Sequence, residues 1–406
     1  MGDTNARRGH AMLQLGRAKE AEGFFREALA EAPDEADHHV GLAHALHGQG
    51  RFSDARDAAR EALRTEPDHV GALSMLASAH GGLKEYAAAM GAVRRGLELA
   101  PQLAFLHRQE GAILIAMDRP QEAASSLERA RSLDPEDSEV AALQGAAAFN
   151  SRQFDDAARF VGEALALDPD NAEAHRLRGL LSLRKGGGRD AVGAHQQAMR
   201  LDPTDAEYRE GMAVAIKSRN PLYGLMLRYG DWYSGLSGGH RWLVWFAPFI
   251  ATKVLRPFDD HLWARVLLVL VYGILVVSWT IEPLMNATLL LRRYTRNLLP
   301  RATRLATYTF LAFFAAAVSC AVAGVVTHSG DWYLVAIGLS LWSVAAGHSH
   351  TVLQARRRLT VWLQAVGGLL GIGAVVTTAL GLGAGMPLSV GLIVTGIAML
   401  WYTNFA

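Results

Sequence analysis

Prolines recur at a fixed interval through the first half of the chain. The spacing is 34 residues five times in succession, at Pro33, Pro67, Pro101, Pro135, Pro169 and Pro203. A period of roughly 20–50 residues is typical of an array whose units each leave an apolar face for the next unit to cover. This half is therefore predicted to be a stack of similar units rather than a single globular core.

Small residues keep the same register as the prolines. Alanine stands twelve residues before each one, at Ala21, Ala55, Ala89, Ala123, Ala157 and Ala191. Two further positions, five and twenty-four residues before each proline, hold only alanine or glycine. Small side chains allow helices to cross closely. Each unit is therefore predicted to be a pair of helices that packs through these alanines.

Acidic residues often precede the proline. They are Glu66, Asp134, Asp168 and Asp202. A carboxylate near the start of a helix accepts hydrogen bonds from unpaired backbone N–H groups and interacts favourably with the helix dipole. We expect these side chains to cap the helix that follows each proline.

The period, the small positions and the proline together resemble the tetratricopeptide repeat family over residues 2–205, as six units followed by a capping helix over 206–217. The resemblance implies an all-α solenoid of six helix-turn-helix repeats that binds a protein or peptide on its concave surface and performs no chemistry. One departure concerns the fourth position of the repeat, where the family often has an aromatic residue. This chain has Asn5, His39, Leu73, His107, Ala141 and His175 there.

The family resemblance also locates a candidate groove on the first helices. The best-known family groove clamps a C-terminal carboxylate with Lys or Arg and Asn, and no pair of residues here reproduces that clamp. The candidate partner-binding residues at the matching positions are His10, His44, Ser74, Ser78, Arg108 and Arg176. We expect a peptide or protein ligand other than a chaperone tail.

Charge divides the chain. Residues 211–406 contain 15 Lys and Arg and 5 Asp and Glu, which leaves 25 basic and 34 acidic residues for 1–210. An acidic array is not expected to bind nucleic acid.

The single Cys320 excludes a disulfide framework, and the His44/His47 pair lacks the Cys or carboxylate partners of a metal site, so neither a metal nor another cofactor is expected.

The second half has the pattern of a membrane domain. Residues 305–330 and 359–406 contain no Asp, Glu, Lys or Arg. About 20 apolar helical residues are enough to cross a bilayer. The predicted spans are 241–256, 264–284, 305–327, 332–350, 360–381 and 387–404.

Arginine-rich loops orient these spans. Five arginines lie between 292 and 304 and three lie at 356–358, whereas the intervening turns contain no Lys or Arg. By the positive-inside rule the arginine loops are cytoplasmic. The start of the chain has no signal-peptide core, so the repeats are also expected in the cytosol. This requires 241–256 to cross; if it is instead re-entrant, the repeats lie outside.

The sequence therefore predicts residues 1–218 as the solenoid, 219–240 as an interfacial linker helix and 241–406 as a polytopic helix bundle. It contains no glycine-rich phosphate loop, paired-carboxylate spacing or zinc motif, so an enzyme is not expected.

The layout is similar to membrane-anchored bacterial tetratricopeptide repeat proteins. The first hypothesis is a scaffold that recruits a partner to the bacterial cytoplasmic membrane and contacts its lipids. The alternative is a polytopic transporter or membrane enzyme that the repeats regulate. Partner identity and oligomeric state stay open.

Overall fold

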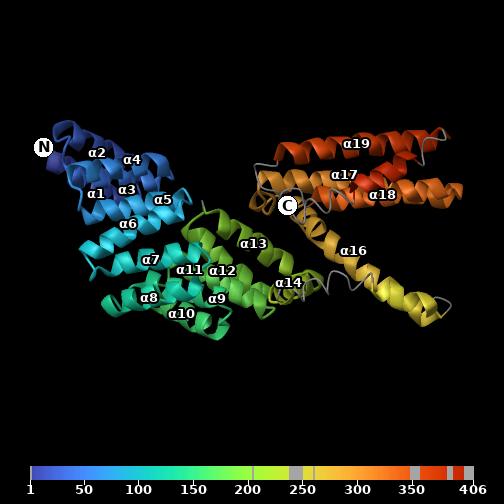
Figure 1. Cartoon of the computed structure of the whole chain (residues 1–406), viewed down its shortest axis with the longest axis horizontal. Coiled ribbons are helices and arrows are strands. Elements are labelled where there is room, and N and C mark those ends of the chain that lie inside the picture. The colour runs from blue at the N-terminus through green and yellow to red at the C-terminus, as the bar shows by residue number, and fades with distance from the viewer. Residues whose placement is uncertain are drawn as a thin grey trace. The chain divides into compact units, whose positions relative to one another are not determined.

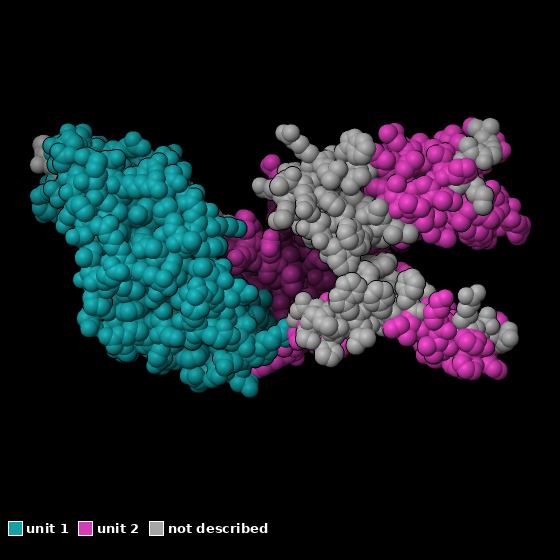
Figure 2. All heavy atoms as spheres, in the orientation of Figure 1, with its two compact units in different colours: residues 1–181, 197–202 teal, residues 182–196, 203–406 magenta. Residues whose placement is uncertain are grey.

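The computed structural model is helical throughout the residues it describes, which are 2–203, 205–236, 250–258, 261–347, 357–381 and 387–396 (Figure 1). This confirms the all-helical prediction for those residues. Contacts divide the chain into two compact units (Figure 2). Unit 1 comprises Met1–Leu181 and Gln197–Asp202, and unit 2 comprises Ser182–Gln196 and Pro203–Ala406.

Six helix pairs follow one another from residue 2 to residue 201. In every pair the first helix has 13 residues and the second has 14. The pairs are α1 (Gly2–Gln14) and α2 (Ala18–Glu31), α3 (Ala36–Gly48) and α4 (Phe52–Thr65), α5 (Val70–Gly82) and α6 (Tyr86–Leu99), α7 (Ala104–Ala116) and α8 (Pro120–Leu133), α9 (Ser138–Asn150) and α10 (Phe154–Leu167), and α11 (Ala172–Arg184) and α12 (Gly188–Leu201).

The alanines that keep register with the prolines are all buried. All six have no exposed surface, which fits their predicted packing role. Side-chain size is also matched between the two helices of a repeat. A Cβ at Gly9 would lie 2.8 Å from the ring of Phe25, and one at Gly111 would lie 2.6 Å from Leu127. Where the repeat has Ala43 instead, the facing residue in the same cluster is the small Ala59.

The turn within each repeat has one backbone signature. The residue two positions after the end of the first helix has a positive φ in every repeat. These residues are Gly16, Gly50, Lys84, Asp118, Arg152 and Gly186. The next residue donates its N–H to a carbonyl in the last turn of the first helix, as Glu85 does to His80 at 2.9 Å. This is the Schellman arrangement, which satisfies carbonyls at the helix end.

The predicted N-terminal capping by the acidic residues before the prolines is wrong. Glu66, Asp134 and Asp168 are the C-cap residues of the preceding helices. The following helices begin only three residues after the proline, so side chains nearer to them act as caps. Asp137, for example, accepts from the backbone N–H of Glu139 and Val140.

Unit 2 continues with α13 (Ala206–Ser218) and α14 (Pro221–Ser234), which correspond to the predicted capping and linker helices. The other described elements include a helical segment at 250–255, η1 (Arg256–Phe258), α16 (Leu262–Leu290), η2 (Arg296–Leu298), α17 (Arg301–Thr327), α18 (Gly330–Gly347), α19 (Arg357–Ala379) and a further helix, Pro387–Gly396. Helix α18 contacts both α17 and α19. Residues 241–249, 348–350 and 397–404 of the predicted spans lie outside the described residues.

The core of unit 2 is built around Trp342, which is 1% exposed. Its indole Nε1 donates to the carbonyl of Leu392 at 3.1 Å. Glycine makes room for the ring, because a Cβ at Gly367 would lie 2.5 Å from it. Close packing through small residues, together with a fully bonded indole, is typical of helix bundles whether they lie in water or in lipid.

The outward faces of these helices are apolar. Exposed large apolar residues include Val269, Ile274, Val322, Val326, Leu369 and Ile372. Within the described part of the chain, one helix, α17, is long and apolar enough to cross a membrane by length and composition. Only 22% of its apolar window is buried. Most of its apolar surface is therefore not used in the packing of unit 2.

Candidate functional site

The first helices of unit 1 form one continuous face. Helices α1, α3, α5, α7 and α9 each contact the next in the series. The second helices of neighbouring repeats, from α2 to α10, have no contact of comparable extent within the described residues. The stack therefore curves toward the first helices, and their shared face is the inner surface of the array.

The six candidate groove residues all lie on these first helices. His10 on α1 and His44 on α3 are exposed. Ser74 and Ser78 on α5, Arg108 on α7 and Arg176 on α11 are half-buried. Their side chains fall into three separate groups: the two serines, the two arginines and the two histidines.

A glutamine that the sequence did not single out joins the two serines. Gln109 on α7 donates through Nε2 to Ser78 Oγ at 2.8 Å and to the Ser74 carbonyl at 2.9 Å. The Ser74 hydroxyl donates to Gln109 Oε1 at 3.2 Å. The side chains of the predicted pair therefore bridge neighbouring repeats, and the hydroxyl proton of Ser78 stays available on the inner face.

The two candidate arginines are already neutralised. Arg108 Nη1 lies 2.8 Å from both Asp137 Oδ2 and Glu139 Oε2 at the start of α9. Arg176 pairs with Glu173 of its own helix at 2.6 Å. A ligand carboxylate would have to displace these partners, so a clamp for a free C-terminus is disfavoured on geometric grounds as well as by residue type.

Histidines cluster at the N-terminal end of the inner face. Partial desolvation, and then the charge of His10, lowers the pKa of His44. Burial, and then the charge of His44, lowers the pKa of His47. His10 packs edge-on against the Phe25 ring at 5.0 Å, and His47 packs against Phe52 at 5.1 Å. The lowered pKa values of His44 and His47 favour their neutral forms, so these two side chains present aromatic rather than cationic surface.

Three other histidines are structural. They occupy the repeat position where the sequence lacks the family's aromatic residue. The Nε2 atoms of His39, His107 and His175 lie 2.8, 2.9 and 2.8 Å from the carbonyls of Pro33, Pro101 and Pro169. A carbonyl only accepts, so each Nε2 donates and ties the first helix to the turn between repeats. The spacing of six residues between proline and histidine is the sequence signal for this contact.

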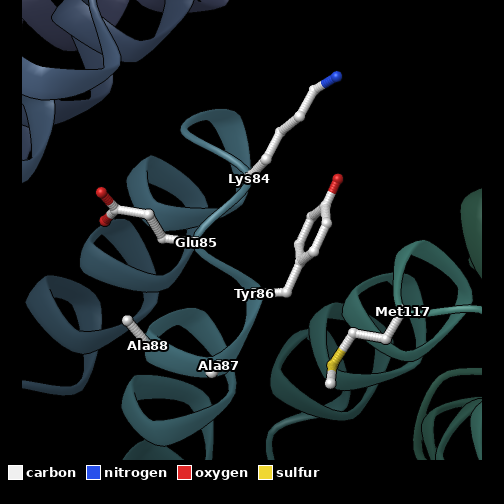
Figure 3. Close-up of a pocket in the computed structure, with 6 residues that line it drawn as sticks. All are labelled: Lys84, Glu85, Tyr86, Ala87, Ala88 and Met117. Atoms are coloured by element: carbon white, nitrogen blue, oxygen red, sulfur yellow. The ribbon is translucent and has the colours of Figure 1, made fainter. Parts of the chain in front are cut away.

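A shallow hollow of about 610 Å³ lies away from the candidate residues, at the turns of the third and fourth repeats. It is lined by Lys84, Glu85, Tyr86, Ala87, Ala88 and Met117. In Figure 3 Lys84 and Tyr86 extend to the same side, and Met117 approaches from the end of α7. Glu85 is engaged by His80, whose Nδ1 lies 2.5 Å from its carboxylate. The hollow offers no cluster of unpaired polar groups.

Unit 2 contains a buried charged group that the sequence did not reveal. Lys217, near the end of α13, is 6% exposed. Its Nζ donates to Asn286 Oδ1 at 3.1 Å and lies 3.7 Å from Glu282, both on α16. It also lies 5.0 Å from the centre of the Tyr223 ring on α14. Burial lowers the pKa of Lys217, and the charge of Glu282 opposes that shift.

Apolar residues surround this polar contact. Ala213 of α13 packs against Leu289 and Leu299, and the nearby Ile216 and Leu298 join the same cluster. The capping helix is therefore held to the end of α16 and to the segment before α17. We call this contact, with Lys217 at its centre, the junction.

Comparisons with known proteins agree with the repeat architecture. Two family models described as tetratricopeptide repeat match the chain, one over residues 12–60 and 114–181 and the other over 40–104. No curated protein matches it.

Several solved structures are similar in fold. PilF of Pseudomonas aeruginosa is 22% identical, with a TM-score of 0.41 over 52% of this chain and 96% of its own. YrrB, described as a TPR protein with an unusual peptide-binding site, is 20% identical, with a TM-score of 0.32 over 45% of this chain and 95% of its own. MamA of Desulfovibrio magneticus RS-1 is 22% identical, with a TM-score of 0.34 over 42% of this chain and 96% of that chain.

Proposed function

Because the repeats within residues 12–181 belong to the tetratricopeptide repeat family, we propose that the chain is a scaffold whose inner face binds a protein or peptide partner. Proteins of this family generally mediate protein–protein interactions, and no catalytic family matches. The observation that carries the proposal is the unbroken series of contacts from α1 to α9, which makes one extended surface out of five repeats.

The inner face changes character along the array. At one register position the residues run from His10, His44 and Ser78 to Ala112, Ala146 and Leu180. The first three repeats thus offer hydrogen-bonding side chains, whereas in the last three the position is apolar, with Ala112 and Leu180 half-buried and Ala146 buried. This gradient suits an amphipathic segment of a partner, with its polar end over the first repeats.

A membrane location is the second part of the proposal. The outward faces of α16, α17 and α19 carry the exposed apolar residues described above, and contiguous apolar surface of this kind is uncommon on proteins that lie wholly in water. Helices of 29, 27 and 23 residues have lengths of about 43, 40 and 34 Å, which is enough for the ~30 Å hydrocarbon core.

The linker helix supports the same location. Leu222, Leu225, Tyr229 and Trp232 are 42–53% exposed and recur along one side of α14. Leucine with tyrosine and tryptophan is the composition of helices that lie at the headgroup level. We propose that this face of α14 rests on the bilayer surface.

The junction supports a cytosolic array. Helix α13 packs against Leu289, just before the arginine-rich segment 292–304, and against Leu299 within that segment. By the positive-inside rule that segment is cytoplasmic. The capping helix of the array would then lie on the cytoplasmic side, as the scaffold hypothesis requires.

The transporter or enzyme alternative has less support. Hydroxyl groups within α17 and α19 bond to carbonyls of their own helix, as Ser319 does to Ala315 and Thr377 to Gly373. Such bonds satisfy polar groups inside an apolar environment and leave few of them to line a substrate path.

The inner-face proposal is tested by adding bulk on opposite sides of one repeat. His44 on α3 and Arg60 on α4 are both exposed, so H44W and R60W change side-chain size without removing a buried contact. We expect crosslinking pull-downs from native membranes to lose the partner with H44W and to keep it with R60W. Equal capture by the two variants would overturn the proposal.

A further inference from the structure

Five arginines lie within 13 residues, three of them between α16 and α17 and two in the first turn of α17. They are Arg292, Arg293, Arg296, Arg301 and Arg304, which we call the arginine collar. We propose that the arginine collar is a binding site for the phosphate groups of anionic phospholipids. The inference rests on the membrane location proposed above and names the lipid class that this end of the bundle recognises.

The charges of the collar are not neutralised by the protein. None of the five arginines has a carboxylate partner within the described residues, whereas arginines of the array such as Arg51, Arg108 and Arg131 pair at 2.5–2.9 Å. Four of the five are exposed, and Arg304 is half-buried. Planar guanidinium groups with free N–H donors bind phosphate oxygens bidentately.

Apolar and aromatic groups stand among these arginines. Leu291 is 86% exposed and Tyr294 is 93% exposed. In water, these two exposed side chains contribute no free energy of apolar burial to the fold. At the headgroup level of a bilayer, leucine would enter the acyl boundary and tyrosine would take its preferred interfacial place, while the arginines reach the phosphates. The mixture therefore selects a lipid surface over a soluble anion.

The collar is also a folded element. The Thr295 hydroxyl donates to the Leu289 carbonyl at 2.6 Å, and η2 forms at Arg296–Leu298. Leu299 is 5% exposed and packs against Ala213 of α13. The arginines are consequently presented on a backbone whose shape is fixed before the ligand arrives, which lowers the entropic cost of binding.

Five like charges on one short segment repel one another when no anion is present. A bound phospholipid would remove that repulsion and so stabilise the collar and the α13 contact beneath it. Lipid binding and junction stability are therefore coupled, and each should strengthen the other.

The test uses the full chain in neutral detergent with added phosphatidylglycerol, phosphatidylcholine or inorganic phosphate, and counts bound lipids by native mass spectrometry. R292Q/R293Q removes two adjacent exposed charges of the collar. R7Q/R8Q removes an equally adjacent exposed pair from α1 and is the matched control. We expect preferential binding of phosphatidylglycerol, weakened about 30-fold by R292Q/R293Q and unchanged by R7Q/R8Q.

Equal binding of the two lipids, or an equal effect of the two variants, would overturn the lipid site. Inhibition of lipid binding by millimolar inorganic phosphate would also overturn it, because the site would then be one for a free anion. Carbonate extraction keeps the two proposals apart. Release of the wild-type chain by carbonate would overturn the membrane location itself, whereas retention without lipid preference would overturn the collar alone.

Discussion

Glu22 on α2 shows how residues far apart in the sequence hold one carboxylate. Burial opposes its ionisation, but hydrogen bonds from Gln49, Arg26 and Arg51 outweigh burial and lower its pKa to about 2. A group whose pKa is lower in the folded state stabilises the fold at pH values above its unfolded-state pKa. This contribution is lost as the pH falls through its folded-state pKa. The contribution should therefore be complete above about pH 5 and absent near pH 2.

We expect E22Q to destabilise the contact between the first two repeats by about 2–3 kcal/mol at pH 7. The difference from wild type should shrink as pH falls toward 2. Hydrogen exchange of α2 and α3 between pH 7 and pH 3 measures this. E20Q is the control, because the Glu20 side chain is 50% exposed and its ion pair with Arg17, at 2.6 Å, stays within one helix turn. A pH-independent effect of E22Q would contradict the assignment.

Lys84 and Asp118 occupy left-handed backbone positions, with φ of 61° and 57°, where the first, second and sixth repeats have glycine. Side chains other than glycine are strained there. K84G and D118G should each stabilise the array by up to about 1 kcal/mol, less the entropy that glycine adds to the unfolded chain. The reverse change, G50K, should destabilise by a similar amount. Thermal unfolding of the three variants measures the change in stability, which should be a gain for K84G and D118G and a loss for G50K.

At the scale of elements, the period predicts the six helix pairs, whereas the capping helix is expected from the family resemblance and the linker helix from the composition of the segment that follows. The period does not predict which residue caps which helix, because that depends on a three-residue shift in where a helix begins. The acidic residues before the prolines were misassigned for this reason. The arginines of the groove could be located from register, but their neutralisation by Asp137 and Glu173 depends on side-chain geometry.

The contacts of the junction could not be predicted from the sequence. Lys217 and Asn286 are 69 residues apart and belong to helices that no repeat relates. The only sequence signal is a lysine in the otherwise apolar last turns of α13. Its partner can be identified only once α13 and α16 are seen in contact.

The junction makes a specific prediction about its polar pair. K217M should loosen α13 from α16 by about 1–3 kcal/mol, because the buried Asn286 loses its donor. K217M/N286L should recover most of that loss, since replacing both partners with apolar groups leaves no unsatisfied atom. Hydrogen exchange of α13 and α14 reports the change. R219M, at an exposed site in the same region, is the control. Additive losses in the double variant would contradict the assigned pair.

At the scale of the whole molecule, the net charge of +1 is the sum of an acidic array and a basic second half. Tryptophan follows the same division, since all nine lie beyond residue 230. The proposed topology gives both facts one cause. Basic residues and tryptophans belong to the part in contact with lipid, whereas the array faces water and a partner.

This topology can be tested with single cysteines, because Cys320 is the only native one and is buried. In a C320A background, cysteine can replace Tyr294 in the collar or Gly330 at the start of α18. Both sites are exposed, and the 27 residues of α17 put about 40 Å of helix between their ends. We expect an impermeant thiol reagent to label G330C in intact cells and Y294C only in inverted vesicles.

A third cysteine decides between the two readings of residues 241–256. R60C places the thiol on the exposed side of α4, within the array. If 241–256 crosses the membrane, R60C should label together with Y294C, because the array and the collar then share the cytoplasmic side. If that segment is re-entrant, R60C should label together with G330C in intact cells. Since the scaffold hypothesis requires a cytosolic array, the second pattern would reject recruitment of a cytosolic partner even if the inner face binds peptides.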